Sequence, residues 1–459
     1  MPSGVSETLT APLDFTPTAA TLDRVITVLD DQGTASDAAL RGEALACYEA
    51  LPAPGARPHR GWKYDYAALK FDELRWTSGR VEMATIPARP VPKPRPEEAG
   101  DADRPALATE NAGGLFFIGA THVDAPSNVD PRVTVAALTE SSKQQFADRL
   151  AGTLHEIVDW RADKFAALAA AFENCGAYVH VPDGVQLDTP IQLVFASAPD
   201  DEAVFPHVVV ILGAGARATV LERHVGEGDP FTCGIVEVLA GESAELDYAV
   251  VQQSGEAARV FFSRNARCER DAQVRWHLAE LGGALARTVM GATLAAPGAR
   301  TETSALFFNT GMQHVDLTSG ADHTVGPTFS DTVVRSAATD RGQGRYVGNI
   351  VIRPKAHGSD ASLRDDALIL GKHAHVDSIP ALEIAANDVK AFHGATVGSL
   401  DEDALFYAGS RGIARGEALR LITLGFFEPV IARFPSAALR DEIRTALDGK
   451  LDAVTEIDR

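Results

Sequence analysis

The chain has 459 residues, of which 45% are hydrophobic and 23% are charged, values typical of folded soluble domains and unlike disordered or membrane-spanning proteins. Its formal net charge of −21 opposes binding to nucleic-acid backbones or anionic lipid, so we expect protein partners, no nucleic acid and no membrane. The first 20 residues contain no Lys or Arg. They lack the basic segment of a signal peptide, which predicts a cytoplasmic protein.

Residues 1–175 are predicted to form an N-terminal tail and a mostly helical region. Ala- and Leu-rich stretches at 36–51 and 141–174 give the helical signal. The second stretch has one apolar face, formed by Phe146, Leu150, Leu154, Ile157 and Val158. The proline-rich segment at 90–96 cannot be helical, because proline has no amide donor and clashes with the preceding turn. We expect an exposed loop there.

Residues 176–398 are predicted to form the core of a parallel β-helix. Short β-rich runs at 208–212, 235–239, 260–262 and 350–352 alternate with turns that contain glycine. These turns recur about every 12 to 16 residues, and helical patterning is nearly absent between them. A strand-and-turn unit that repeats without intervening helices favours a solenoid over a closed sandwich. The fold class is therefore mainly β.

Residues 399–459 are predicted to be helical. Ser399 and Glu402 have the spacing of a capping box, so a helix should begin at Ser399. It should end near Gly412, where a left-handed backbone is tolerated. Two further helices are expected, the first over about 416–433. These helices could close the end of the solenoid or bind a partner.

One segment resembles a nucleotide-binding motif. An apolar strand at 207–212 is followed at 213–218 by Gly-Ala-Gly-Ala-Arg-Ala. A dinucleotide site needs a helix directly after the glycines, because the pyrophosphate lies at the helix N-terminus. Residues 218–222 instead have the pattern of another strand, so we interpret the glycines as a solenoid turn. The chain also has no G-x-x-x-x-G-K-[ST] phosphate loop.

The paired acids could serve a glycosidase, since many β-helix proteins act on polysaccharides. We interpret Asp365 and Asp366 as the start of a turn or a strand edge. Asp401 and Asp403 fit the first turn of a helix, where the helix dipole favours acidic side chains. A carbohydrate-active β-helix enzyme is therefore an alternative with little support.

The four cysteines are widely separated, at Cys47, Cys175, Cys233 and Cys268. No C-x-x-C pair is present, so buried structural thiols are the simplest interpretation, although the four could still converge in the fold. We expect no iron–sulfur cluster to be stably bound by this chain alone.

Three histidines are candidate functional residues. His373 and His375 would share one face of a strand as a metal or proton-handling pair, or they are ordinary core or exposed histidines. His393 lies where the last strand is expected to pass into the first C-terminal helix. Its residue type alone fits a structural and a functional role equally well.

The segment that begins at His393 carries a family resemblance. Residues 393–413, starting His-Gly-Ala-Thr-Val-Gly-Ser-Leu-Asp-Glu-Asp, resemble the signature of SufD proteins in the SufB/SufD family of iron–sulfur cluster assembly scaffolds. Similar patterns occur at 62–64, 181–185, 349–354, 365–370 and 380–384. The stretch 371–377 lacks the cysteine of SufB proteins, which favours SufD. Ala391 stands where SufD proteins often have a cysteine.

This resemblance implies a right-handed parallel β-helix, flanked by N-terminal and C-terminal helical regions, that acts as a non-catalytic scaffold subunit. It implies pairing with a SufB-like paralogue, and a transient cluster shared with that partner at an interface where His393 is a ligand or a proton-handling neighbour. It also implies that the C-terminal helices recruit a SufC-like ATPase. We assign that contact to Phe406, Tyr407, Arg411, Leu421, Leu424 and Phe427. A structural homodimer is the remaining alternative, and the isolated chain could form one.

Overall fold

The computed structural model of the chain describes residues 13–31, 37–53, 66, 69–71, 74–76, 79–81, 113–123, 130–196, 202–228 and 230–452. The proline-rich segment at 90–96 and the Trp-Lys-Tyr run at 62–64 lie outside the described residues. Within the described part of the chain, no helix is long and apolar enough to cross a membrane.

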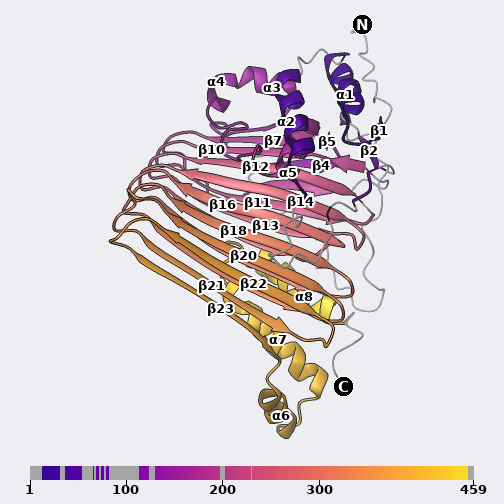
Figure 1. Cartoon of the computed structure of the whole chain (residues 1–459), viewed down its shortest axis with the longest axis vertical. Helices are drawn as coiled ribbons and strands as arrows, with labels where there is room; N and C mark the ends of the chain where they lie inside the picture. Colours follow the sequence, from indigo (N-terminus) through magenta and orange to yellow (C-terminus); the bar gives the residue numbers. More distant parts are fainter. Residues whose placement is uncertain are drawn as a thin grey trace.

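Two long sheets, here called sheet A and sheet B, form the body of the molecule (Figure 1). The strands of sheet A are β1 (Leu13–Phe15), β2 (Leu74–Trp76), β6 (Thr134–Ala137), β7 (Cys175–Val181), β9 (Glu202–Val204), β10 (Pro206–Leu212), β12 (Phe231–Ala240), β14 (Arg259–Cys268), β16 (Leu285–Leu294), β18 (His314–His323), β20 (Gln343–Ile352) and β22 (His375–Ile384). The strands of sheet B are β3 (Gly79–Val81), β4 (Gly114–Ile118), β5 (Thr121–Val123), β8 (Ile191–Ala196), β11 (Arg217–Gly226), β13 (Glu245–Ser254), β15 (Gln273–Glu280), β17 (Arg300–Asn309), β19 (Phe329–Ala338), β21 (Asp360–Ile369) and β23 (Lys390–Ser399).

The long strands alternate between the two sheets along the chain, and each pairs in parallel with the strand two places later. Arg217 of β11 pairs with Glu245 of β13, which pairs with Gln273 of β15. One coil therefore consists of two strand-and-turn units, one in each sheet. The glycine spacing in the sequence marks half a coil. The predicted parallel β-helix is confirmed.

The interior of the solenoid is packed with alternate residues of the long strands. In β13, Leu246, Tyr248 and Val250 point inward and are fully buried, together with the equivalent positions of the neighbouring coils. Successive side chains of a strand point to opposite faces, so one apolar set fills the space between the sheets. This interior makes the coils stack in one register, because a one-residue slip would expose the apolar set.

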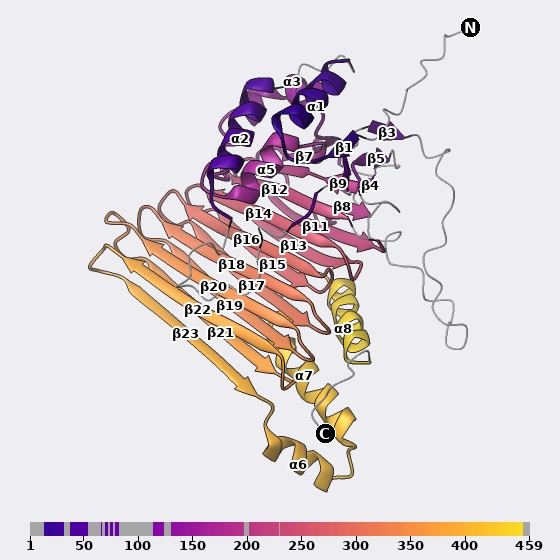
Figure 2. The same ribbon diagram turned by 45° about the vertical axis from the view of Figure 1, so that its right-hand side comes forward.

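The N-terminal helices cover the outer face of sheet A at its first coils (Figure 2). They are α1 (Ala19–Asp31), α2 (Ala38–Ala50), α3 (Glu140–Gln145), α4 (Ala147–Leu150) and α5 (Lys164–Phe172). Helix α5 lies directly on the sheet, where Phe165 stacks on Phe261 of β14. Asp163 caps this helix by accepting from the amides of Phe165 and Ala166. Its carboxylate also pairs with Arg287 of β16 at 2.6 Å, which ties the helix to the solenoid.

The continuous helix predicted over 141–174 is wrong, because the chain breaks into turns between α4 and α5. The reason is long-range. The amides of His155, Ile157 and Val158 donate to the Glu237 carboxylate of β12 at 2.6, 2.8 and 2.9 Å. A continued helix would have used these amides for its own carbonyls. The region before residue 175 also contributes strands β1 to β6, so helices make up only part of it.

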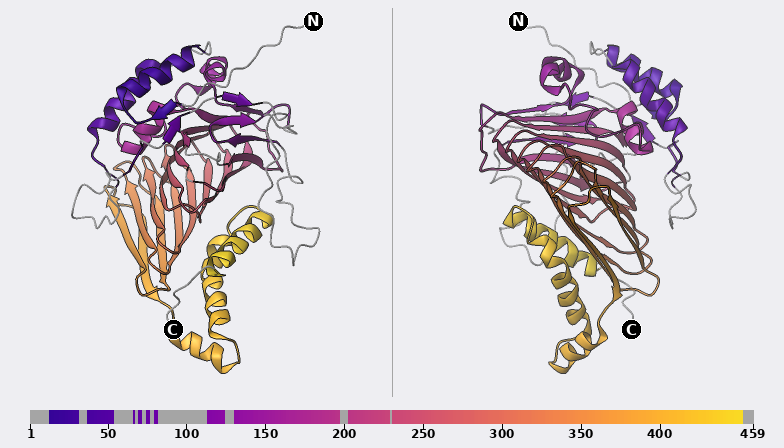
Figure 3. Two further views of the ribbon diagram at one scale, coloured as in Figure 1. Left: turned by 90° about the vertical axis from the view of Figure 1, so that its right-hand side faces the viewer. Right: turned by 60° about the vertical axis from the view of Figure 1, so that its left-hand side comes forward.

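The C-terminal helices fold back along the outer face of sheet B (Figures 2 and 3). They are α6 (Glu402–Ser410), α7 (Arg415–Ile431) and α8 (Ala437–Asp452). Leu439, Ile443 and Leu447 of α8 are buried in this contact. The helices therefore do not close the last coil of the solenoid, and α6 extends away from the body of the molecule (Figure 3).

The cap of α6 differs from the predicted capping box. Asp401 is the N-cap residue, and its carboxylate accepts from the amides of Asp403 and Ala404 at 2.9 and 3.4 Å. Ser399 cannot take this role, because it is still paired with Ile369 as the last residue of β23. The predicted end of the helix agrees with the structure, where Gly412 has a φ of +84°.

Candidate functional site

The last coil of the solenoid leaves two neighbouring strand edges without a partner strand among the described residues. Strand β22 ends sheet A and strand β23 ends sheet B, at the same end of the molecule (Figure 1). We call these two strands the open edge. Large apolar side chains are exposed on it: Ile384 at 45%, Phe392 at 53% and Val397 at 49%. Unpaired backbone beside exposed apolar side chains is typical of a surface that pairs with another chain.

Alternate backbone groups of β23 point away from sheet B. The amide of Lys390 donates to the carbonyl of Ser359 at 2.9 Å, inside the sheet. In a parallel ladder every second residue bonds to the same neighbour, so the residues in between direct their amides and carbonyls outward. His393 and Ala395 belong to the outward set. The open edge can therefore donate to and accept from an added strand.

His393 lies within β23 and not at its end, which corrects the predicted junction. The strand continues through Gly394 to Ser399, because its residues stay paired with β21. His393 pairs with Leu363, whose side chain points into the solenoid interior and is 1% exposed. The imidazole thus lies on the interior face. It is exposed because no further coil covers it. His393 is therefore positioned at the mouth of the interior.

Asp365 lies on the same interior face as His393 and was misinterpreted from the sequence. It is in the middle of β21, two residues after the partner of His393, and is fully buried. Asp366 is on the opposite face, in an ion pair with Arg335 at 3.3 Å. Adjacent strand residues point to opposite faces, so the two acids cannot act as a glycosidase pair. The alternation of Ala361, Leu363, Asp365 and Ala367 was the available signal for a buried acid.

The environment of Asp365 brings the pKa of its carboxyl group close to neutral pH. Burial raises its pKa to about 7, the Ser378 hydroxyl opposes this in part, and Asp366 raises it further. Neither oxygen of Asp365 makes a hydrogen bond of acceptable geometry to a described residue. A carboxyl group with a pKa close to the working pH can both give and accept a proton. The mouth of the interior therefore combines an exposed imidazole with a buried proton-exchanging acid.

We expect Asp365→Asn to stabilise the folded chain at pH 8 but not at pH 4. Below about pH 4 the carboxyl is protonated in both the folded and the unfolded chain, so its burial does not lower the free energy of unfolding. As the pH rises toward 7 the unfolded chain ionises first, so this group lowers the free energy of unfolding by up to about 4 kcal/mol. Thermal unfolding at both pH values measures the difference. Asp366→Asn is the matched control, and an equal effect of Asp365→Asn at both pH values would contradict the account.

The two other histidines do not share one strand face, so the metal or proton-handling pair that the sequence left open for them is not formed. His373 is in the turn before β22 and is exposed, whereas His375 begins the strand. The turn ends only at Ala374, so His373 is not part of the strand. The rule that every second strand residue shares one face therefore does not apply to it. His375 instead faces Asp377, with its Nε2 2.6 Å from the carboxylate.

Helix α6 and the start of α7 carry an exposed apolar patch. Phe406 is 78% exposed, Tyr407 61% and Leu421 55%. The Arg411 guanidinium lies 5.3 Å from the centre of the Tyr407 ring. Leu405 is the buried residue of α6, so the helix holds to the rest of the chain by a narrow contact. We call Phe406, Tyr407, Arg411 and Leu421 the α6 patch.

Two residues assigned to the same contact from the sequence lie elsewhere. Phe427 is fully buried and packs on Phe308 of β17, with ring centres 6.1 Å apart. It belongs to the contact between α7 and sheet B, so it has no free surface for a partner. Leu424 is only partly buried and packs against the same cluster. The sequence could not separate the sheet-facing side of α7 from its free side, because both sides carry apolar residues.

The cysteines do not add ligands at the open edge. Burial raises the pKa of Cys175 and Cys233 well above the usual value, and that of Cys268 to about 12. All three are packed in apolar clusters, and Cys47 is half-buried next to helix α5. A thiol held in its protonated form is a poor metal ligand and a poor nucleophile. These cysteines therefore have the features of structural residues.

Comparison with known proteins points to one family. A family model described as "SUF system FeS cluster assembly, SufBD core domain" matches residues 194–426, about half of the chain. The iron-sulfur cluster assembly protein SufD of Bacillus subtilis is 27% identical over 292 residues, which cover 63% of this chain and 67% of the relative. The corresponding SufB protein of that species is 24% identical over 384 residues, which cover 82% and 83%. A SufBD family protein of Mycobacterium leprae is 27% identical over 262 residues, which cover 56% of this chain and 30% of the relative.

Proposed function

The chain belongs to the SufB/SufD family of iron–sulfur cluster assembly proteins, and from this premise we propose that it is a non-catalytic scaffold subunit of cluster assembly in the cytoplasm. In this role it pairs with a SufB-like paralogue through the open edge and recruits a SufC-like ATPase through the α6 patch. The observation that supports the proposal most directly is the open edge, where unpaired strands, exposed apolar side chains and His393 occur together.

A second solenoid of the same family fits the open edge better than a single peptide strand. Both sheets end at the same coil, with β22 and β23 side by side in the chain's last turn. A partner with two edge strands of its own can therefore extend sheets A and B together and cover Phe392 and Val397. A second copy of this chain could use the same contacts, so the paralogue and the homodimer are separated by experiment.

The cluster is the cargo of this scaffold, and His393 is the residue of this chain that meets it. A cluster needs thiolate ligands, and an imidazole can replace one of them and change the reduction potential. The buried cysteines of this chain are held as thiols, so the thiolates come from the partner. Asp365, directly inside the mouth, exchanges protons as ligands bind or leave. The cluster is accordingly transient and shared.

Co-expression tests the proposed assembly. The full chain carrying an affinity tag is produced together with the SufB-like and SufC-like proteins of its own genome. We expect the three proteins to elute together in gel filtration, with more SufB-containing complex than homodimer. A tagged chain that elutes as a homodimer in the presence of both proteins would contradict the proposed pairing.

We expect Phe406→Asp to release the ATPase while pairing through the open edge is kept. A central apolar contact contributes about 2 kcal/mol or more, so the affinity for the ATPase should fall at least about 30-fold. Phe406 is 78% exposed, so the substitution leaves the fold intact. Titration of the purified complex with the ATPase measures the loss. The control is Met312→Asp, at an 82% exposed residue in the turn before β18. Equal affinities of both variants for the ATPase would exclude the α6 patch as its binding site.

A further inference from the structure

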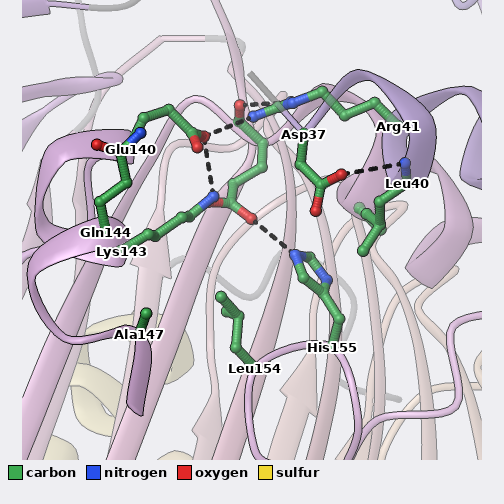
Figure 4. A pocket seen from close by; sticks show the side chains of 11 residues that line it. Asp37, Leu40, Arg41, Glu140, Lys143, Gln144, Ala147, Leu154 and His155 are labelled. Carbon is green, nitrogen blue, oxygen red and sulfur yellow. Dashed lines mark hydrogen bonds and ion pairs between the residues drawn. The ribbon is translucent and has the colours of Figure 1, made fainter. Parts of the chain in front are cut away.

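A second cluster of ligand-type side chains lies at the other end of the solenoid, on the outer face of sheet A. His155 comes from the turns after α4, Glu173 follows the end of α5, and His207 is on β10. His155 and Glu173 line a cavity of about 220 Å³ together with residues of α2 and α3, and His207 contacts Glu173 behind it. In Figure 4 a dashed line joins the His155 ring to the Glu173 carboxylate, which lies between that ring and the Lys143 ammonium group.

The three side chains converge on one point. The Glu173 Oε2 atom lies 2.9 Å from His207 Nδ1 and 3.6 Å from His155 Nε2. One ligand atom from each of the three residues lies within 4.8 Å of the others. No other group of three such residues occurs in the part of the chain that the structure describes. All three side chains are at least nine-tenths buried, at 10% exposure for His155, 5% for Glu173 and 1% for His207.

His155 has no hydrogen-bond partner for its ring within the described structure. Its Nδ1 is buried and unpaired, and a separation of 3.6 Å from Glu173 is too long for a hydrogen bond. The backbone of His155 is also in the left-handed region, at a φ of +61°. Such a conformation is unfavourable for residues other than glycine and is often found at functional sites. The Nε2 atom, which faces Glu173 Oε2 at 3.6 Å without a hydrogen bond, is the ring nitrogen that a bound ion would engage, and Nδ1 would stay without a described partner.

The surrounding groups hold the other two residues in position. The Nε2 atom of His207 lies 2.9 Å from the Glu237 carboxylate, which is itself anchored by three backbone amides. A carboxylate behind a histidine is the usual arrangement around metal-binding histidines, because it orients the ring and increases its basicity. Lys143 lies 2.6 Å from Oε1 of Glu173 and leaves Oε2 toward the histidines. Each candidate ligand except His155 thus has its own support.

We propose that His155, Glu173 and His207 bind a divalent first-row transition metal ion through His155 Nε2, Glu173 Oε2 and His207 Nδ1, with an open coordination position toward the cavity. Two histidines and one carboxylate are a donor set that Zn²⁺ and Fe²⁺ accept. Metal bonds of about 2.1 Å in a tetrahedral arrangement place ligand atoms about 3.4 Å apart. The separations of 2.9 and 3.6 Å bracket this value.

Two of the three candidate ligands are already in the protonation state that binds a metal ion, whereas at His207 a metal ion has to displace a proton. Burial lowers the pKa of His155 well below its usual value, and His207 lowers it further, so His155 offers a neutral imidazole. Burial alone would raise the pKa of Glu173, but Lys143 and His207 outweigh it and keep the carboxylate ionised. Burial disfavours the charged form of His207, yet Glu173 and Glu237 raise its pKa to about 9. The metal replaces the proton that His207 carries between these two carboxylates.

Equilibrium dialysis of the full, tag-free chain against Zn²⁺ tests the site after treatment with a chelator. We expect one Zn²⁺ per chain. Loss of a residue that only supports a ligand lowers metal affinity about 10- to 100-fold. Loss of a ligand itself should cost more, so His155→Asn should weaken Zn²⁺ binding at least about 100-fold. Asparagine tolerates the left-handed backbone, so this variant keeps the local fold. Glu237→Gln should weaken binding by about 10- to 100-fold. His375→Ala removes a half-buried histidine that also faces a carboxylate, and it should leave the stoichiometry of Zn²⁺ binding unchanged.

Substitution with Co²⁺ identifies the ligands independently of affinity. We expect visible absorption bands typical of nitrogen and oxygen ligands, without the intense near-ultraviolet charge-transfer band of a thiolate, and we expect them to disappear in His155→Asn and in His207→Gln. Circular dichroism and thermal unfolding confirm that each variant is folded. Absence of stoichiometric Zn²⁺ binding to the wild-type chain would overturn the proposal. Undiminished binding to the folded double variant of His155 and His207 would also overturn it.

Discussion

Ala395→Pro is expected to weaken pairing through the open edge at least about 5-fold while the isolated chain stays folded. Proline has no amide hydrogen and is tolerated in edge strands where that hydrogen would point to solvent. The register from Lys390 directs the amide of Ala395 away from β21, so no bond inside sheet B is lost. In the complex, however, the carbonyl of the partner strand would lose its donor and meet the proline ring.

The expected loss is large because the unpaired group is buried at the interface. An unsatisfied buried carbonyl costs about 1–3 kcal/mol, which corresponds to about a 5- to 150-fold loss of affinity before the ring clash is added. Sedimentation or gel filtration with the SufB-like partner measures the loss. Ala395→Ser keeps the amide and is the matched control. Unchanged pairing of a folded Ala395→Pro chain would exclude strand addition at β23 as the mode of assembly.

Much of the architecture could be predicted because it depends on local, repeated patterns. Apolar residues alternate with polar ones along the strands, and turn glycines recur at a nearly constant spacing, so the solenoid can be recognised without long-range information. The three C-terminal helices were predicted from the helical spacing of their apolar residues and from Gly412, which ends the first of them. Their position was not predictable. Helices α7 and α8 lie along sheet B because they pack on apolar residues from many separate strands, which only the folded sheet brings together.

The sites were less predictable, because they depend on contacts between residues distant in sequence. The carboxylate of Glu237 ends the helical stretch after α4 by accepting from three amides that lie 79 to 82 residues earlier in the chain. Inside the solenoid, Glu222 accepts two bonds from Arg264 at 2.8 and 2.9 Å, and neither residue has a sequence signature. Asp365 looked like a turn residue because an adjacent acid masked the strand alternation.

His393 was singled out from the sequence by its position and by a family resemblance, and the structure corrects that position. It is not a helix-entry residue with a local bond, since its side chain makes no hydrogen bond to a described residue. Its position in an edge strand, on the interior face and beside Asp365, is consistent with a role at the proposed joint. A structural role would require hydrogen-bond partners, and the described residues offer none to the His393 side chain.

His393→Ala tests this role directly, because it should lower cluster formation without changing the fold. An exposed side chain without intramolecular bonds contributes within about 0.5 kcal/mol to folding, so thermal stability and assembly with both partners should be unchanged. Loss of a ligand or proton-handling group at the joint should lower cluster formation about tenfold or more. His373→Ala, an exposed histidine in the turn before β22, is the matched control.

The most direct test of the central claim is the amount of cluster formed per folded three-protein complex. It is measured after reconstitution with iron and sulfide, for the wild type and for His393→Ala. The account predicts at least about a tenfold loss for His393→Ala, at equal thermal stability and equal subunit stoichiometry. A stable His393→Ala complex that assembles the full amount of cluster would contradict it.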